Sequence, residues 1–220
     1  MIKCCIFDLD GTLLSTLDTI TYHLNNTLLS FGLRKITVDD CAAFIGNGAR
    51  KLVERAIKSG GEYSDDLRDG VLSIYNMAYN SEPLPLTSPY PGIIELVNKL
   101  YDSGVYLGVV TNKPENTAKQ LISHFFGDKF ISVIGGRPGA ALKPDPADSL
   151  SLIESVGVKA SETAFIGDTY VDIQTGKNMG ASLSVGVLWG FRDEDELARA
   201  GADIIVSDTD ELWEALKNAN

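Results

Sequence analysis

Residues 2–12 read IKCCIFDLDGT and join an apolar run to a pair of acids. The first six of these residues have the length and composition of a buried strand. Asp8 and Asp10 follow at a spacing of two, which places both carboxylates on one rim, and Gly11 allows a sharp turn after them. Ligands of open parallel α/β sheets bind at the carboxyl ends of strands, so we expect chemistry here, although Asp and Gly are also common in ordinary turns.

Apolar runs and amphipathic patterns alternate in the second half of the chain. They predict strands over 106–110, 130–134, 163–166, 183–187 and 203–206, and helices over 93–100, 115–125, 147–156, 171–179 and 211–217. Strands that alternate with helices imply right-handed βαβ crossovers and a parallel sheet covered on both faces. The sequence therefore predicts an α/β fold, a doubly wound parallel sheet of Rossmann-like type that includes the first strand.

Residues 16–78 carry helical patterns without a strand signal. Leu17, Ile20, Leu24 and Leu28 share one stripe, and residues 37–40 have the Thr-x-x-acid form of a helix start. Four prolines between positions 83 and 91 then end the helical pattern. We expect an all-helical cap domain over 15–83, inserted above the catalytic rim of a core formed by 1–14 and 84–220.

Composition limits the possible partners and location of the protein. The 220 residues carry a net charge of -11, which argues against a nucleic-acid or anionic membrane surface. No apolar stretch is long enough to span a bilayer and none resembles a signal peptide, so we expect a cytoplasmic protein without a membrane partner. Three cysteines without CxxC spacing indicate reduced thiols. Both a monomer and a homodimer remain open.

Further polar motifs follow other predicted strands: Thr111-Asn112, Lys143-Pro144 and GDTYVD at 167–172. With the first motif, they resemble the haloacid dehalogenase superfamily of aspartate-nucleophile phosphatases, most closely its phosphoglycolate phosphatase branch. The similarity covers nearly the whole chain, including 90–92 and 110–114. Each motif alone is common in turns and helix caps, but together and in this order they favour a functional site. One departure is segment 135–142, which is less charged than we expect of relatives.

The resemblance implies a phosphoric monoester hydrolase in which Asp8 is the nucleophile and Asp10 the general acid and base. Asp8 would form an aspartyl-phosphate, and the presence of Asp10 favours phosphate ester hydrolysis over dehalogenation. The resemblance also implies Mg²⁺ as cofactor, bound by Asp8, Asp168 and the backbone carbonyl of Asp10, with Asp172 in or beside the shell. Such a set suits Mg²⁺, which prefers oxygen ligands and would screen the attacking carboxylate from a phosphate dianion.

A phosphoryl group in transit also needs hydrogen-bond donors and fixed positive charge. Thr111 and Asn112 can donate side-chain hydrogen bonds, and the turn at Gly11 and Thr12 offers backbone amides. Lys143 adds the charge. We therefore expect Thr111 and Lys143 to act in catalysis and the other three to bind substrate.

Substrate choice is expected to lie in the cap. Residues 46–56 resemble the cap loop and helix of phosphoglycolate phosphatases, and Arg50 or Lys51 could receive an anionic group such as a carboxylate, with a solvated helix face as the alternative. The expected substrate is a small phosphorylated metabolite, and phosphoglycolate is the first candidate. A phosphosugar mutase or a pyrophosphatase of the same fold remains open. So does a receiver-like phospho-acceptor signalling module, although receivers lack a helical insert after their first strand.

Overall fold

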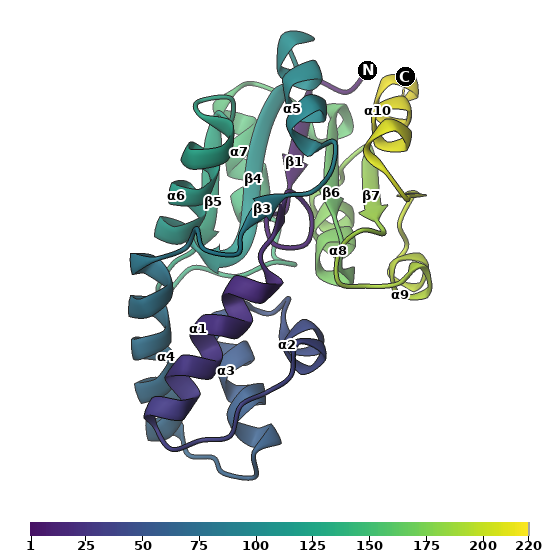
Figure 1. Ribbon diagram of the computed structural model, residues 1–220. Helices are drawn as coiled ribbons and strands as arrows, with labels where there is room; N and C mark the ends of the chain where they lie inside the picture. The colour runs from purple at the N-terminus through teal and green to yellow at the C-terminus, as the bar shows by residue number, and fades with distance from the viewer. Residues whose placement is uncertain (220) are drawn as a thin grey trace.

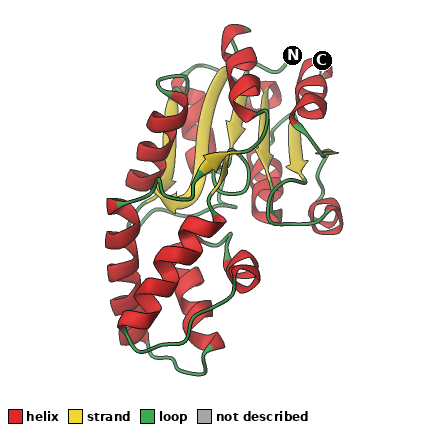
Figure 2. Cartoon of the chain, viewed as in Figure 1, coloured by secondary structure: helices red, strands yellow, loops and turns green. Residues whose placement is uncertain are grey.

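A computed structural model describes residues 1–219 and shows a sheet between two layers of helices, with a separate group of helices at one end (Figure 1). Six strands form the sheet in the order β5-β4-β1-β6-β7-β8, all parallel (Figure 2). They are β1 Cys4–Phe7, β4 Tyr106–Pro114, β5 Ser132–Gly136, β6 Thr163–Gly167, β7 Leu183–Val187 and β8 Ile204–Val206. The doubly wound parallel sheet predicted from the sequence is confirmed, with β1 near its centre.

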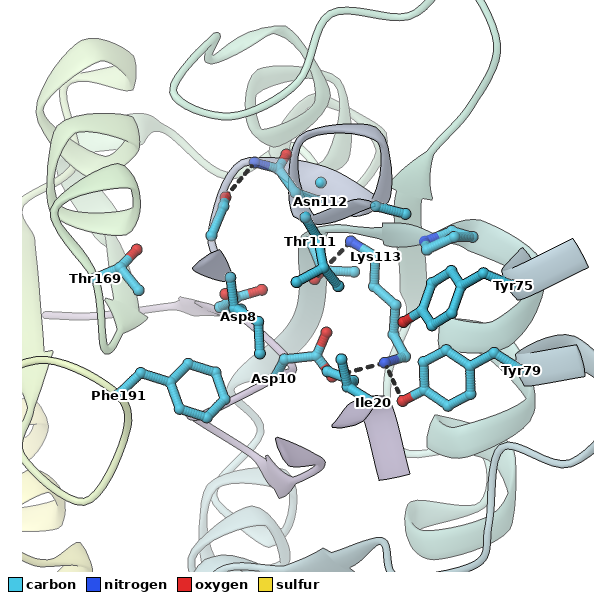
Figure 3. A pocket seen from close by; sticks show the side chains of 16 residues that line it. Asp8, Asp10, Ile20, Tyr75, Tyr79, Thr111, Asn112, Lys113, Thr169 and Phe191 are labelled. Atoms are coloured by element: carbon cyan, nitrogen blue, oxygen red, sulfur yellow. Dashed lines mark hydrogen bonds and ion pairs between the residues drawn. The ribbon is translucent and has the colours of Figure 1, made fainter. Parts of the chain in front are cut away.

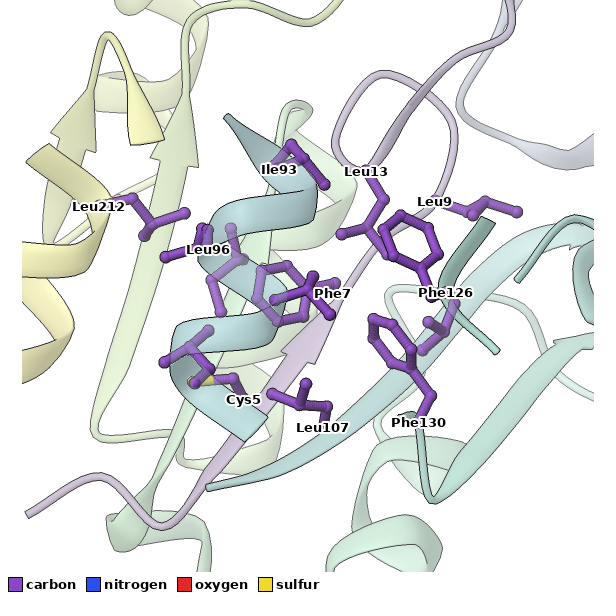
Figure 4. Close-up of a cluster of buried hydrophobic side chains, with 14 of the residues drawn as sticks. Cys5, Phe7, Leu9, Leu13, Ile93, Leu96, Leu107, Phe126, Phe130 and Leu212 are labelled. Carbon is purple, nitrogen blue, oxygen red and sulfur yellow. The ribbon is translucent and has the colours of Figure 1, made fainter. Parts of the chain in front are cut away.

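Strand β1 is fully buried because both of its faces are covered. Cys5 and Phe7 pack in the cluster under α5 (Ile93–Asp102), α6 (Glu115–Phe126) and α10 (Thr209–Asn218), where Figure 4 shows Phe7 near Phe130. Cys4 and Ile6 pack in the opposite cluster, under α7 (Ala147–Ser155) and α8 (Tyr170–Met179). This follows from the alternation of side chains along a strand. The core helices are α5 Ile93–Asp102, α6 Glu115–Phe126, α7 Ala147–Ser155, α8 Tyr170–Met179, α9 Glu194–Arg199 and α10 Thr209–Asn218, with a 3-10 turn η1 at Ala160–Glu162.

Four helices lie between the short strands β2 (Leu14–Ser15) and β3 (Ser88–Pro89) and form a cap. They are α1 Leu17–Ser30, α2 Val38–Phe44, α3 Gly48–Ser59 and α4 Asp65–Ser81. They enclose a hydrophobic cluster of their own, which includes the fully buried Leu24 and Leu28. The predicted helix start at 37–40 is confirmed, since the Thr37 hydroxyl accepts a hydrogen bond from the Asp40 amide and the Asp40 carboxylate accepts one from the Thr37 amide.

A two-stranded ribbon connects cap and core. Strand β2, Leu14–Ser15, pairs antiparallel with β3, Ser88–Pro89, so the two chain crossings run side by side. The separate hydrophobic clusters support the division of the chain into cap and core, while its limits at 14/15 and 83/84 stay a prediction.

The elements differ from the sequence prediction at a few places. Helix α9 and the ribbon were not predicted, because six and two residues are too short to give a periodic pattern. Strand β5 lies two residues further along than expected. Strand β4 continues through polar residues to Pro114, with an irregularity after Val110. Within residues 1–219, no helix combines the length and apolar character needed to cross a bilayer.

Candidate active site

Three neighbouring strands bring polar side chains to one edge of the sheet. Asp8 follows β1, Thr111 lies in the last part of β4, and Asp168 follows β6. Strands β4 and β6 flank β1 in parallel, so their carboxyl ends meet at this edge. Figure 3 shows Asp8, Asp10 and Thr111 around a common cavity.

A cluster of three acids lies at this edge. One carboxylate oxygen from each of Asp8, Asp168 and Asp172 lies within 4.8 Å of the others. Asp168 is fixed at both oxygens: the Thr12 hydroxyl donates to Oδ1 and the Phe191 amide to Oδ2, each at 2.9 Å. The two loops that follow β1 and β7 therefore orient this acid.

Lys143 balances part of the negative charge. Its Nζ lies 2.6 Å from Asp172 Oδ1 and 2.9 Å from Asp8 Oδ1. The other Asp172 oxygen accepts hydrogen bonds from the amide and hydroxyl of Thr169, at 2.9 and 2.8 Å, where α8 begins. Asn112 holds the backbone of Lys143, because its Oδ1 accepts from the Lys143 amide at 2.8 Å and its Nδ2 donates to the Lys143 carbonyl at 3.3 Å.

Burial sets the electrostatics of the cluster. It raises the pKa of Asp8 to about 6, with Lys143 opposing and Asp172 adding to the effect. Burial, then the charges of Asp172 and Asp8, raise the pKa of Asp168 well above its ordinary value. Burial alone would lower the pKa of Lys143, but the two neighbouring carboxylates raise it to about 12. Lys143 alone leaves three buried acids short of positive charge.

The acids fit a divalent cation. Asp8 Oδ1 is buried and makes no hydrogen bond of good geometry, although Lys143 Nζ is an ion-pair neighbour at 2.9 Å. The donor atoms of the cluster are all oxygens, the type that Mg²⁺ prefers. Asp8, Asp168 and Asp172 could thus hold such an ion and gain the missing positive charge.

The turn after β1 packs its backbone against the acids. Gly11 has a φ of +84°, and a Cβ added there would lie 2.2 Å from Asp168 Oδ2. The amides of Gly11 and Thr12 donate to carbonyl oxygens of the same turn, at 3.0 and 3.3 Å. Both amides are therefore engaged within the turn, and their service to a phosphoryl group stays a prediction. Within residues 1–219, the amides of Leu9 and Asp10 remain without a protein acceptor.

Asp10 lies on the cap side of the cluster. Its Oδ1 accepts hydrogen bonds from the Thr16 hydroxyl at 2.7 Å and from Lys113 Nζ at 2.8 Å. Lys113 also donates to the Tyr79 hydroxyl of α4 at 2.6 Å (Figure 3). Burial lowers the pKa of Lys113, while the neighbouring Asp10 charge opposes that shift. Asp10 is therefore held by one residue at the cap entrance and one that the cap itself contacts.

The cap closes over these groups to form a cavity. Asn112 Nδ2 donates to the carbonyl of Gly46 at 3.0 Å, and Arg192 donates to the carbonyls of Ala42 and Ile45 at 2.9 and 3.0 Å. The cavity is lined on the core side by Asp8, Asp10, Thr111, Asn112, Lys113, Pro114, Thr169 and Phe191, and on the cap side by Ile20, Ile45, Gly46, Gly48, Ala49, Leu52, Tyr75 and Tyr79. The cap thus supplies mainly apolar walls and two tyrosines.

A family model described as haloacid dehalogenase-like hydrolase matches residues 5–185. The chain belongs to this family. A phosphoglycolate phosphatase from Rhodospirillum rubrum is 35% identical over 214 residues, which cover 94% of this chain and 88% of that protein. Solved structures agree: one from Lactobacillus delbrueckii subsp. bulgaricus has a TM-score of 0.91 at 31% identity and covers 97% of this chain and 98% of its own. A predicted phosphoglycolate phosphatase from Haemophilus somnus has a TM-score of 0.90 at 27% identity, with 97% of both chains covered.

The haloacid dehalogenase-like fold and these relatives make the chain a phosphatase of phosphoric monoesters. The structure brings most of the sequence-predicted site residues together. Asp8, Asp10, Thr111 and Asn112 line the cavity, and Lys143, Asp168 and Asp172 adjoin Asp8. Asn112 does not offer its amide group to the cavity as expected, because both of its polar atoms are engaged with Gly46 and Lys143.

Arg50 is not part of this site. Its side chain is 57% exposed and lies 3.2 Å from Asp69 Oδ1, an ion pair on the cap surface. It is not among the residues that line the cavity. The expectation that Arg50 receives an anionic group of the substrate is therefore not supported, and the alternative of a solvated helix face describes it better.

Sequence reasoning missed Lys113 and Tyr79. A signal for Lys113 was present, since it stands two residues after Thr111 and alternate residues of a strand share a face. Tyr79 lies in the cap helix α4, 34 positions before Lys113, and only the folded chain brings the two together.

Proposed function

We propose that this phosphatase requires Mg²⁺ and hydrolyses a small phosphorylated metabolite through an aspartyl-phosphate at Asp8. Phosphoglycolate is the leading candidate for the substrate. The observation that carries this proposal is the buried cluster of Asp8, Asp168 and Asp172 with Lys143 beside it. The phosphoglycolate phosphatase names of similar proteins support the choice of substrate.

Asp8 is the attacking group of the proposed reaction. One of its oxygens forms a bond to phosphorus while the bond from phosphorus to the ester oxygen breaks, which gives the aspartyl-phosphate and a leaving alkoxide. Lys143 and Thr111 adjoin Asp8 and stabilise the negative charge that spreads over the phosphoryl oxygens. The free amides of Leu9 and Asp10 add donors on the same side.

Asp10 moves the protons. It gives a proton to the leaving alkoxide, and then accepts one from the water that attacks the aspartyl-phosphate. The bond from phosphorus to the Asp8 oxygen breaks in this second step, which releases inorganic phosphate and restores the carboxylate of Asp8. The closed cap excludes bulk water during the first step and must open to admit water and release products.

The Mg²⁺ ion would be held by Asp8, Asp168 and the Asp10 carbonyl, with Asp172 in or beside the shell. It would supply positive charge between the attacking carboxylate and the phosphate dianion. The hydrogen bonds from Thr12 and Phe191 to Asp168 keep that acid turned toward the cluster.

The test is phosphate release from a panel of phosphorylated metabolites, with Mg²⁺ and with a chelator. We expect phosphoglycolate to be turned over fastest and Asp8→Asn to lower kcat by at least about 1000-fold. Asp128→Asn, a change of an exposed acid, serves as the matched control. Full activity in chelator, or in the Asp8 variant, would refute the mechanism. Faster phosphate release from pyrophosphate would instead favour a pyrophosphatase, and isomerisation of hexose 1-phosphates without phosphate release would favour a mutase.

A further inference from the structure

Lys113 occupies a position in the cavity that the proposed mechanism does not explain. Its side chain is 2% exposed and it is a cavity-lining residue on β4, two positions after Thr111. Figure 3 shows it reaching between Asp10 and Tyr79. Its Nζ also lies 4.3 Å from the centroid of the Tyr79 ring. Burying the charge of a lysine in the wall of a phosphatase cavity costs free energy, and we expect a function that offsets this cost.

The hydrogen bonds of Lys113 are incomplete. An ammonium group has three N–H donors. Two acceptors are present within residues 1–219, Asp10 Oδ1 at 2.8 Å and the Tyr79 hydroxyl at 2.6 Å. The remaining donor lies in a side chain that borders the cavity. A buried charged N–H without an acceptor costs free energy, and a ligand oxygen in the cavity could accept a hydrogen bond from the third N–H of Lys113.

Lys113 is also the one cationic residue among those that line the cavity. Lys143 is not among the residues that line the cavity, and its Nζ is engaged with Asp8 and Asp172. Arg50 points to the surface and pairs with Asp69. The cap side of the cavity is lined by apolar side chains such as Ile20 and Leu52, by small residues and by two neutral tyrosines, and none of these residues carries a positive charge. Among the cavity-lining residues, Lys113 is therefore the one that offers a positive charge to an anionic leaving group.

The position of Lys113 relative to Asp10 limits where that anion sits on the substrate. As general acid, Asp10 must lie within about 3 Å of the ester oxygen of the leaving group. Lys113 Nζ is 2.8 Å from Asp10 Oδ1, and so lies close to the same oxygen. In a 2-phosphorylated carboxylic acid, the carboxylate carbon is two bonds from the ester oxygen. Such a carboxylate reaches Lys113 while the ester oxygen faces Asp10.

We infer that Lys113 binds the carboxylate of the leaving group and selects substrates that carry it on the carbon bearing the phosphate ester. This inference rests on the proposed function and assigns a residue to its substrate preference. Lys113 acts through a hydrogen bond made to the bound substrate before and during the reaction, so its loss should appear mainly in KM.

The test compares phosphoglycolate with ethyl phosphate, which lacks the carboxylate. Lys113→Met should lower the ratio of kcat/KM for phosphoglycolate to that for ethyl phosphate by roughly 10- to 100-fold. The ratio cancels any shared loss that arises through Asp10. Lys113→Gln is the second variant, should the first fail to fold, and Lys119→Met, an exposed lysine of α6, is the matched control.

Each outcome decides the inference. A fall in the ratio, carried by KM, supports it, whereas a ratio that stays within about twofold of the parent overturns it and leaves Lys113 as a partner of Asp10 only. A parent enzyme that hydrolyses both compounds equally well overturns the inference but leaves the phosphatase mechanism intact. A parent enzyme inactive on both compounds with Mg²⁺ overturns the proposed function, and the inference with it.

Discussion

Replacing Gly11 with alanine places a methyl group directly against Asp168. The added Cβ would lie 2.2 Å from Oδ2 and 2.6 Å from Cγ of that acid, about 1 Å short of an ordinary contact. Asp168 must then move by a comparable distance, whereas metal sites tolerate ligand displacements of about 0.2 Å. The backbone adds a second cost, because a φ of +84° costs an L residue roughly 1–2 kcal/mol.

Gly32→Ala separates these two effects. Gly32 has a similar φ of +73°, but a Cβ added there meets no atom within 4 Å. Both variants should lose about 1–2 kcal/mol of folding free energy from the backbone. Gly11→Ala alone should weaken Mg²⁺ binding, by at least about 100-fold, because it displaces Asp168, a proposed ligand of the ion.

The assay is the Mg²⁺ concentration that gives half-maximal phosphatase activity, together with direct calorimetric titration of Mg²⁺ and thermal unfolding of the metal-free proteins. A Gly11→Ala enzyme with the parent's Mg²⁺ affinity would show that Asp168 is not a ligand or that the turn relaxes freely. An equal loss of Mg²⁺ affinity in Gly32→Ala would show that the effect comes from backbone strain alone.

Three further predictions concern pH, packing and the cap. Burial raises the pKa of Asp8 to about 6, so the ionised carboxylate destabilises the metal-free parent near neutral pH and Asp8→Asn should be more stable. The difference in stability should shrink as the pH falls through 6, and thermal unfolding in which the difference grows instead would contradict this prediction. Leu24→Ala should cost roughly 2–5 kcal/mol in urea unfolding, against under about 1 kcal/mol for the half-exposed Leu29→Ala, and equal costs would deny the cap a core of its own. Arg192→Met should speed amide hydrogen exchange in α2 roughly tenfold, whereas Arg199→Met should not, and unchanged exchange would exclude Arg192 as a cap contact in solution.

The fold could be predicted because its signals are local. The apolar run before Asp8, the alternation after residue 92 and the helical stripes of 16–78 each reflect burial that a segment imposes on its own sequence. Helix α9 lacked such a signal, since its six residues present only Leu197 to the core. Strand β4 was cut short in prediction because the polar residues that end it belong to the site.

The candidate site was predictable in its acids and less so in its donors. Asp8 and Asp168 each follow a strand of the predicted parallel sheet. The carboxyl ends of parallel strands lie at one edge of the sheet, so both acids could be expected there. The partners of Asn112, Arg50 and Lys113 depend on how the cap docks, a long-range arrangement that no local pattern encodes. The sequence offered Arg50 as a possible receptor of an anion, whereas the cationic residue that lines the cavity is Lys113.

The ribbon of β2 and β3 makes the cap an exchangeable module. Leu14 and Pro89 are directly paired across it, so the ends of the insert leave the core as neighbours and a hairpin turn of about two to five residues would close the gap. Such an insertion point accepts shorter, longer or unrelated lids without disturbing the nucleophile and its acids. Grafting another cap between β2 and β3 would change the apolar walls of the cavity, while Lys113, which belongs to the core, would stay in place.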